Sequence, residues 1–530
     1  MYIHPRSLNH KIFDVWRSPG RFTKNPDIVR LPKGRLLLVY SDNDAHWSQE
    51  NQVLTILASD DDGRIWFKLS EVDRADLRQG DERLVTPRLS LLSDGRLVVL
   101  IDHDDNGHFH IQQKPGIWAY WSTDGGRTWS AHQDTGIPGF EPDRMMELPD
   151  GRLAVATHVM LPDGQEFADV LSCSEDGGQS WYRAATMAFD GYHRFCEGAI
   201  IHLKGGELAC VMRENHSRGI PCFVVFSSDS GNTWSPPQML PFSIHRPYGK
   251  QLPDGRVLIT GRHMNGPIGT YAWVGDLKAE AGTYAPGGPR SEYHAELSPD
   301  TLVITNSPGM QGCRYSLLPP ESSRSHVVMD AVVKVEGPAG VPVAFMGISK
   351  LGIAVQIASN GIRTRSGVDF QKPVNMTQYH RLTIHHQGGW LQVQVDGETV
   401  IHECIYWDTD NQADWFARDN LAGMTWFGET GDEGRSFWKS VRMDIKNRSL
   451  LPFSWNWEAL SGKLPDDYQR TRMIQLHVNV MKETNWPDHG YSSWLTLPDG
   501  RILLVDYTNL NDLPGKSHLV GLYLDSVDLV

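Results

Sequence analysis

A short turn of the form Leu-Pro-Asp-Gly-Arg, followed by an apolar run, recurs along this chain of 530 residues. Apolar residues flank each turn on both sides, as in LSLLSDGRLVVLI, which is the pattern of a β-hairpin whose glycine needs a positive φ. The first five turns are about 50 to 60 residues apart, and the sixth follows about 245 residues later. A regular repeat with one long gap predicts a repetitive β fold that a separate domain interrupts. The repeat glycines are Gly34, Gly95, Gly151, Gly206, Gly255 and Gly500.

A second repeat, Ser-x-Asp-x-Gly-x-Thr-Trp, alternates with these hairpin turns. A short Asp can accept hydrogen bonds from its own turn amides, Gly supplies the left-handed residue, and Trp fills the space between neighbouring sheets. We therefore expect these aspartates to be structural and not catalytic. One hairpin turn and one such motif in every 50 to 60 residues is typical of a four-stranded propeller blade, so six hairpin turns predict six blades. The motif stands at residues 59–66, 122–129, 174–181 and 227–234.

Together the two repeats resemble those of the sialidase superfamily, whose Asp boxes have this form. The resemblance covers roughly residues 20–280 and 470–530, although the fifth repeat near 271–277 has no box. It implies an all-β protein with a sialidase-like, six-bladed β-propeller. We expect residues 1–284 to form blades one to five and residues 456–530 to form the last blade and the closure.

The gap in the repeat, residues 285–455, contains no Asp box. Its alternating strands, such as HRLTIHHQGGWLQVQVDGETVI, resemble a laminin-G or concanavalin-like module. This resemblance implies a lectin-like β-sandwich of jelly-roll type inserted into the propeller. Two roles are open for the insert: it binds carbohydrate, or it is a structural wedge that only supports the propeller.

The composition argues against several classes of partner. The net charge is −14, whereas a protein that binds nucleic acid or an anionic membrane should carry a positive field. No apolar run approaches the roughly 18 residues of a membrane span. The six cysteines form no CxxC pair, so the sequence predicts neither a redox motif nor a zinc site. The N-terminus has no apolar signal core, so we expect a cytoplasmic protein or a secreted one whose leader has been removed.

The repeat glycine also locates candidate site residues, because the inner strands of all blades line one axis. Arg, Glu and Tyr side chains that converge there would form a concave polar site, where chemistry is expected first. Nine residues before the glycines stand Asn25, Thr86, Pro142, Glu197, Arg246 and Tyr491. Seven residues after them stand Ser41, Asp102, His158, Arg213, Arg262 and Tyr507.

The sialidase resemblance assigns roles to three of these residues. Glu197 and Arg213 stand 16 residues apart in the fourth repeat, as they do in the family, and Tyr491 matches the tyrosine of the family's last blade. Tyr491 and Glu197 thus resemble a nucleophile pair, in which the carboxylate takes the phenol proton as attack occurs. A phenol also repels an anionic substrate less than a carboxylate nucleophile would.

Two departures from the family concern its clamp of three arginines. Lys24 stands where the first arginine is expected; it keeps the charge but loses the bidentate fork that grips a carboxylate. No arginine follows Arg262 where the third is expected, although Arg246 or Arg262 could replace it from another direction. The clamp is incomplete, which argues against strict specificity for sialic acid.

The loop of the first blade, SDNDAHWSQENQ, should carry the acid/base group, with Asp44 as first candidate and His46 as second. Histidines crowd the other loops of this face. No carboxylate or thiolate accompanies the closely spaced His108 and His110, so we expect no metal and no cofactor. We expect His158 and His263 to bind sugar hydroxyls or to transfer protons. The remaining histidines of this group are His103, His216 and His245.

The leading hypothesis is an exo-acting, sialidase-like glycoside hydrolase that cleaves a terminal, acidic sugar from a glycan. Tyr491 would form the covalent intermediate, and Asp44 or His46 would protonate the leaving oxygen. The residues that would bind the substrate, several of them through its acid group, are Lys24, Arg213, Arg246, Arg262, His158, His263 and Tyr507.

Two alternatives remain, and both also take a glycan or oligosaccharide as partner. A polysaccharide lyase would cleave a uronate-containing glycan by β-elimination, with a cation on the carboxylate and a His or Tyr to remove the C5 proton. A non-catalytic glycan-binding propeller would need neither acid nor nucleophile. The presence of Tyr491, Glu197 and Arg213 together argues against this last alternative.

Overall fold

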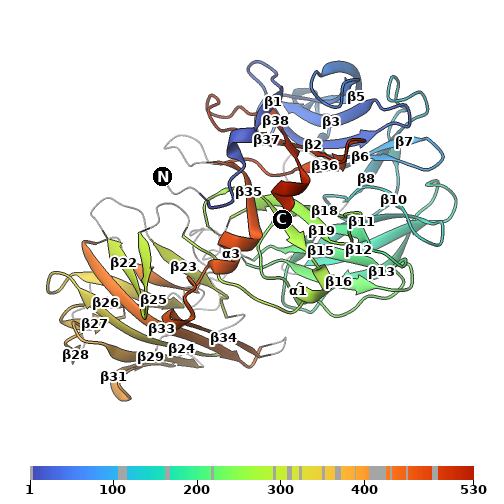
Figure 1. Cartoon of the computed structure of the whole chain (residues 1–530). Coiled ribbons are helices and arrows are strands. Elements are labelled where there is room, and N and C mark those ends of the chain that lie inside the picture. Colours follow the sequence, from blue (N-terminus) through green and yellow to red (C-terminus); the bar gives the residue numbers. More distant parts are fainter. Residues whose placement is uncertain are drawn as a thin grey trace.

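The computed structural model describes most of the chain, and the described part is almost entirely β-structure (Figure 1). Two short α-helices, α1 (Leu277–Glu280) and α3 (Asp467–Arg472), are among its few helical turns. No helix in the described part is long and apolar enough to cross a membrane. The described residues are 4–104, 116–160, 167–216, 220–264, 266–289, 294–306, 313–320, 325–348, 353–364, 372–387, 390–404, 425–429, 432–448, 452–479 and 487–530.

Four antiparallel sheets of four strands follow one another along the first half of the chain, each built from consecutive strands. The first holds β2 (Phe22–Arg30), β3 (Leu36–Asn43), β4 (Asn51–Ser59) and β5 (Phe67–Asp76). The second holds β6 (Arg83–Leu91), β7 (Leu97–Asp104), β8 (Ile117–Ser122) and β9 (Gln133–Asp134). The third holds β10 (Met146–Glu147), β11 (Leu153–Met160), β12 (Phe167–Ser174) and β13 (Tyr182–Ala188). The fourth holds β14 (Phe195–His202), β15 (Leu208–Glu214), β16 (Phe223–Ser227) and β17 (Gln238–Met239).

The last two four-stranded sheets each combine distant parts of the chain. The fifth holds β18 (His245–Gln251), β19 (Val257–His263), β20 (Gly269–Gly275) and, after a long interruption, β35 (Met473–Val478). The sixth holds β36 (Ser493–Thr496), β37 (Ile502–Thr508), β38 (His518–Leu524) and the N-terminal β1 (Phe13–Trp16). Pairing of β1 with β38 ties the start of the chain to its end.

A buried apolar cluster fills each gap between successive sheets. Leu37 of the first sheet packs with Leu97 of the second, and Leu171 of the third packs with Leu208 of the fourth. The circuit closes where Val505 of the sixth sheet packs with residues of the first. Clusters between the second and third, fourth and fifth, and fifth and sixth sheets complete it. The predicted all-β, six-bladed propeller is thereby confirmed.

The repeated motifs occupy the predicted turns. All six repeat glycines lie between the first two strands of a sheet and have φ values between 83° and 97°. In the second sheet, the Asp124 carboxylate accepts hydrogen bonds from the backbone N–H groups of Arg127 and Thr128 and from the Thr128 hydroxyl. Asp176 and Asp229 make the equivalent contacts in their own turns. These aspartates hold turns together, as predicted.

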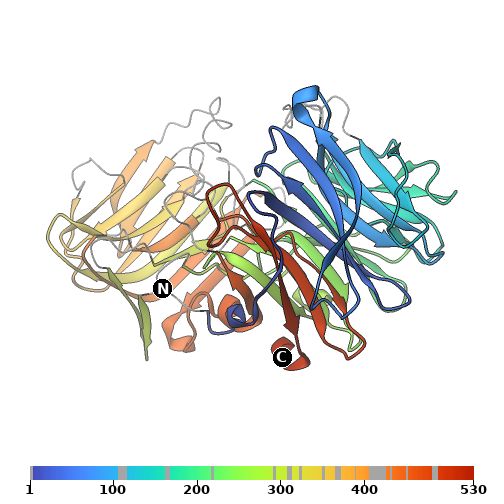
Figure 2. The ribbon, with the colours of Figure 1, turned by 90° about the horizontal axis from the view of Figure 1, so that it is seen from above.

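The residues between β20 and β35 contribute two further sheets, seen in yellow and orange beside the propeller (Figures 1 and 2). A single buried cluster, which includes Tyr315, Phe427 and Trp438, lies between these sheets, so they form a β-sandwich. One sheet holds β21 (Ala295–Ser298), β22 (Thr301–Asn306), β24 (His326–Glu336), β29 (His380–Gln387), β30 (Trp390–Val395), β31 (Glu398–Cys404), β33 (Gly434–Lys446) and β34 (Phe453–Glu458). The other holds β23 (Arg314–Leu317), β25 (Pro342–Ile348), β26 (Ile353–Ala358), β27 (Gly361–Arg363), β28 (Lys372–Pro373) and β32 (Thr425–Glu429).

We expect the propeller to fold without residues 285–455 when a short linker replaces them. The sandwich has its own core, whereas α3 belongs to the propeller, since Tyr468 accepts a hydrogen bond from Trp273 Nε1 at 2.8 Å. Excision uncovers the apolar contacts of Met239 and Tyr284, and it also removes the core against which Trp457 and Ala459, which stay in the chain, are packed. Thermal unfolding of the excised propeller should show one cooperative transition. Aggregation of every linker variant would mean that the sandwich is part of the propeller core.

Candidate active site

The inner strands of the propeller begin with irregular backbone. The register shifts near the start of β2, β6, β14 and β18, as in a β-bulge. At each shift one non-glycine residue has a positive φ, a strained conformation that is concentrated at functional sites. These residues are Asn25 (55°), Thr86 (49°), Glu197 (56°) and Arg246 (50°), and Glu141 (44°) has a positive φ in the segment before β10 of the third sheet.

The structure brings the predicted pair Tyr491 and Glu197 into contact, although 294 residues separate the two in sequence. The Tyr491 hydroxyl donates to Glu197 Oε1 at 3.4 Å. Arg213 Nη1 donates to the same oxygen at 2.9 Å, and the backbone N–H of Arg246 donates to Oε2 at 2.6 Å. Arg213 therefore orients the carboxylate that faces the tyrosine.

The glycine before Tyr491 allows this segment to come close to Arg262. Gly490 has a φ of 86°, and a Cβ at this position would come within 2.6 Å of the Arg262 Cβ. Only glycine accepts both conditions. The guanidinium carbon of Arg262 consequently lies 5.2 Å from the centre of the Tyr491 ring.

The charges around Glu197 and Tyr491 set their protonation. Burial opposes ionisation of Glu197, but Arg213 and Arg246 outweigh it and hold the pKa of Glu197 below its usual range. Burial raises the pKa of Tyr491 well above 10, and the neighbouring carboxylates Glu141 and Glu197 add to this. At neutral pH the pair is therefore a phenol beside a carboxylate.

Glu141 is a third ionisable group of this site, and the sequence analysis missed it. Burial and the charge of Glu197 raise the pKa of Glu141 to about 8. The two carboxyl groups thus share one proton at neutral pH, which Glu141 carries. The Glu141 side chain is 15% exposed against 3% for Glu197, so Glu141 is the more accessible of the two.

Neighbouring residues hold Glu141 in place. The Arg246 Nη1 donates to the carbonyl oxygen of Glu141 at 2.8 Å and lies 3.4 Å from its carboxylate. The Asp102 carboxylate accepts the backbone N–H of Glu141 at 3.2 Å. Burial raises the pKa of Asp102 to about 6. Arg246 is 1% exposed, so it holds the loop of Glu141 through hydrogen bonds made inside the protein.

A second polar network connects the loop of the first blade to the last blade through Asp488, which the sequence analysis also missed. Asp488 Oδ1 lies 2.9 Å from Arg262 Nη2 and accepts the Tyr507 hydroxyl at 2.5 Å. Its other oxygen pairs with the Nδ1 of His46. Burial opposes ionisation of Asp488, but His46 and Arg262 hold its pKa far below the usual range. Asp488 is therefore the carboxylate that orients His46.

The two acid/base candidates of the first-blade loop have different positions. The Asp44 carboxylate accepts the backbone N–H groups of Gln49, Glu50 and Asn51, each at 3.2 Å, so it closes its own loop. His46 instead reaches the network of Asp488. Of the two side chains, only that of His46 has a described contact with another blade; Asp44 contacts the last blade through its backbone carbonyl oxygen, which accepts Lys516 Nζ at 2.9 Å.

Lys24 and Trp47 form one edge of the site. Lys24 Nζ donates to the carbonyl oxygen of His46 at 2.7 Å and lies 5.4 Å from the centre of the Trp47 ring. Burial lowers the pKa of Lys24 to about 8. Trp47 is 47% exposed, which is unusual for so large an apolar side chain. An exposed indole beside a polar site is a surface on which a sugar ring can stack.

The histidines have mostly internal partners. His158 Nδ1 accepts the backbone N–H of Glu197 at 3.4 Å, and burial lowers the pKa of His158 to about 4, so it is neutral. His263 Nδ1 lies 2.8 Å from the carbonyl oxygen of Ser243. His103 and His216 pair with Glu82 and Glu214. The described part does not include His108, His110 or the side chain of Asp104. Within the described part, no group of three or more His, Cys, Asp or Glu residues could hold a metal ion.

Comparisons with known proteins agree with the repeat architecture. Residues 8–135 and 109–267 match the profile of the BNR repeat-like domain. A comparison with curated proteins gave no match. A protein of unknown function from Dyadobacter fermentans aligns with 58% of this chain and 94% of its own at 16% identity and a TM-score of 0.45.

Two enzymes of known structure align with similar scores. A mutant Trypanosoma rangeli sialidase aligns with 81% of this chain and 92% of its own (12% identity, TM-score 0.39). An α-L-arabinanase from Penicillium chrysogenum aligns with 56% of this chain and 92% of its own (18% identity, TM-score 0.40). Residues 8–267 thus match the BNR repeat-like domain, which agrees with the sialidase-like repeats of the sequence.

Proposed function

We propose that this protein is an exo-acting glycoside hydrolase of sialidase type that removes a terminal sugar from a glycan. One observation carries the proposal: the Tyr491 hydroxyl faces an ionised Glu197, and Glu141, which keeps its proton to about pH 8, shares the same site. A nucleophile, a base and an acid thus meet on one face.

In the first step the Tyr491 oxygen attacks the anomeric carbon while its proton passes to Glu197. The glycosidic bond breaks, and the leaving oxygen takes the proton of Glu141. In the second step water attacks the glycosyl-tyrosine, giving a proton to the Glu141 carboxylate, and Tyr491 recovers its proton from Glu197. The two displacements retain the configuration of the anomeric carbon. Glu141 here takes the role that the sequence analysis gave to Asp44 or His46.

The first experiment is a panel of glycans, with the products examined for released monosaccharide and for its anomeric configuration. Release of a terminal monosaccharide with retained configuration supports the proposal. Release with inverted configuration would contradict the Tyr491 intermediate, since one direct displacement inverts the carbon.

The cations of the face have internal partners, which bears on the predicted acidic substrate. Arg213, Arg246 and Arg262 each lie within salt-bridge distance of a carboxylate: Glu197, Glu141 and Asp488 respectively. Lys24 Nζ instead donates to the carbonyl oxygen of His46, so its charge can serve a ligand. We therefore place the carboxylate of an acidic sugar, such as a uronic acid, beside Lys24.

We expect the protein to bind a carboxylated sugar at least about tenfold more tightly than the same sugar reduced to the alcohol, because a buried, charge-assisted hydrogen bond is worth about 1.5–3 kcal/mol. Competition binding with the two sugars measures this difference. In Lys24→Met the difference should disappear while the affinity for the reduced sugar stays the same. Equal affinity of the parent protein for both sugars would contradict an acidic substrate.

The His46–Asp488 pair favours a second candidate function, a lyase that acts on a uronate-containing glycan. A histidine oriented by a carboxylate is a suitable base for removing the C5 proton, and Tyr507 lies in the same network. A lyase produces an unsaturated uronate that absorbs in the ultraviolet, whereas a hydrolase does not. Absorbance recorded during the glycan panel therefore separates the two functions.

A further inference from the structure

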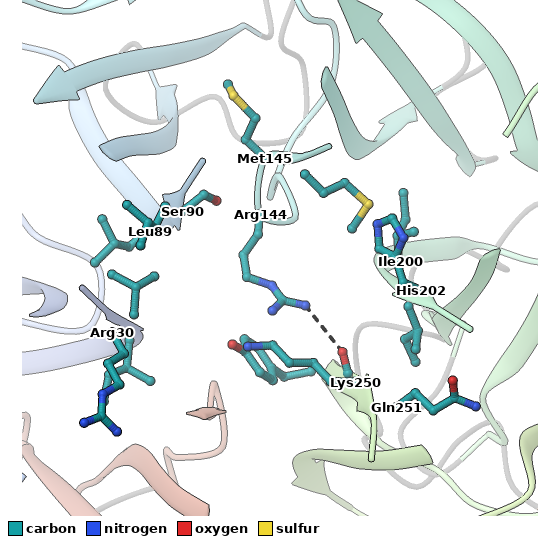
Figure 3. Close-up of a pocket in the computed structure, with 16 residues that line it drawn as sticks. Arg30, Leu89, Ser90, Arg144, Met145, Ile200, His202, Lys250 and Gln251 are labelled. Carbon is teal, nitrogen blue, oxygen red and sulfur yellow. Dashed lines mark hydrogen bonds between the residues drawn. The ribbon is translucent and has the colours of Figure 1, made fainter. Parts of the chain in front are cut away.

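A cavity of about 440 Å³ lies where inner strands of several propeller sheets come together (Figure 3). Its walls are the inner strands β2, β6, β14 and β18 together with the residues around β10. The lining residues follow the strained starts of these strands by two to five positions, about 7–16 Å at the rise of a β-strand. The cavity is therefore separate from the site of Tyr491 and Glu197.

Three cationic side chains line this cavity in a chain whose net charge is −14. Figure 3 shows Arg144 reaching into its centre, with Lys250 beside it and Arg30 at the edge. Lys250 Nζ makes one hydrogen bond, to the carbonyl oxygen of Trp494 at 3.4 Å, and the described residues give it no carboxylate within 4 Å. The exposed His202 stands at the opening, so the cavity is accessible from solvent.

The nearest carboxylates use part of their hydrogen-bonding capacity on the backbone of neighbouring blades. Asp27 Oδ2 accepts the N–H of Leu89 at 3.0 Å, and Asp143 Oδ2 accepts the N–H of Ile200 at 2.9 Å. Asp143 lies 3.7 Å from Arg144 Nε, which is too long for a hydrogen bond. These two aspartates tie blades together and leave donors on the cations available.

Several buried donors at this cavity have no hydrogen-bond partner among the described residues. They are the Nε of Arg144, the hydroxyl of Ser90 and the Nε of the adjacent Arg88. Ser90 lines the cavity and is 5% exposed, and Arg88 is 3% exposed. Buried donors without partners are costly, and a ligand that accepts hydrogen bonds would remove this cost.

We propose that this cavity is a second ligand site, and that it binds a small oxyanion of the phosphate or sulfate type. Arg144 and Lys250 supply charge-assisted donors, and Ser90 supplies a neutral one. Burial lowers the pKa of Lys250 to about 7, and a bound anion would favour its ammonium form. The site is independent of the proposed hydrolase activity, because no residue of the nucleophile pair lines it.

Calorimetric titration of the full chain with sodium phosphate at pH 6.5, with sodium chloride at matched ionic strength as the blank, tests the proposal. We expect saturable binding of one phosphate, and sulfate should compete for it. Lys250→Met should weaken phosphate at least about fivefold, and Arg144→Met should do the same if that variant keeps its circular dichroism spectrum. Lys204→Met, which removes an exposed cation near the same turns, should leave the affinity unchanged.

Two results would overturn the proposal. One is the absence of saturable phosphate binding to the parent protein. The other is binding that Lys250→Met changes less than about fivefold, which would place phosphate on surface cations. Glycan hydrolysis is measured on the same variants and should keep the parent rate, so that loss of the oxyanion site and failure of the proposed function are distinguishable.

Discussion

Replacing Tyr491 with phenylalanine should lower turnover at least about a hundredfold and leave the fold intact. The change removes one oxygen, whose described hydrogen bond is the 3.4 Å contact with Glu197. The ring keeps its neighbours, since its packing against Tyr507 and the Arg262 guanidinium does not involve the hydroxyl. Turnover is measured on the best substrate of the glycan panel, and circular dichroism checks the fold.

Tyr523→Phe is the matched control for this variant. It removes the hydroxyl of a tyrosine in β38, one that donates to the carbonyl oxygen of Asp62 at 3.0 Å near a turn of the first blade. We expect this control to keep normal turnover. Near-normal turnover of Tyr491→Phe itself would exclude Tyr491 from the mechanism, and the hydrolase proposal would fail with it.

The number of propeller sheets was predictable because each hairpin turn is specified by its own local sequence. A glycine with positive φ between two apolar runs needs no information from the rest of the chain, and all six such glycines have this conformation. The partners of β1 and β35 were not predictable in the same way. A strand of four residues such as FDVW contains nothing that specifies which distant edge it pairs with, and yet β1 completes the sixth sheet.

The site was predictable where the repeat kept its register. Glu197 and Tyr491 stand nine residues before their glycines, and the structure brings them together. Glu141 stands ten residues before Gly151, because the bend in the third sheet is displaced by one position, and counting residues therefore selected Pro142. A carboxylate next to the counted position in the segment Phe-Glu-Pro-Asp was the available signal.

Asp488 could not be found by counting at all. It lies in the segment before β36, outside any strand, and its importance comes from partners on other blades, namely His46 and Arg262. Such a role depends on three-dimensional closure of the propeller. Its only sequence signal is its position three residues before Tyr491, in a segment that also contains Gly490.

Glu141→Gln should lower turnover on natural glycans about 10²- to 10⁴-fold, the range expected for loss of a positioned acid. A glycoside with a strongly acidic leaving group, such as dinitrophenol, needs no protonation, so its release should fall far less. Selective rescue by this substrate would separate an acid catalyst from a residue that only supports the fold. Equal losses on both substrates would contradict the acid role.

The pH dependence of the same variant gives an independent test, and its sign follows from the raised pKa of Glu141. Burial and Glu197 raise this pKa from 4.5 to about 8, so between these pH values the folded protein holds a proton that the unfolded chain releases. Stability contributed by this group is therefore present below pH 4.5 and lost as pH rises toward 8. Glutamine imitates the protonated acid and does not titrate. The melting temperature of Glu141→Gln minus that of the parent should therefore increase from pH 5 to pH 8. Activity of the parent should fall as pH rises through about 8, because Glu141 then lacks the proton that the leaving oxygen needs. A constant difference in melting temperature across this range would mean that Glu141 is ionised throughout, and the proton donor would have to be sought elsewhere, first at His46.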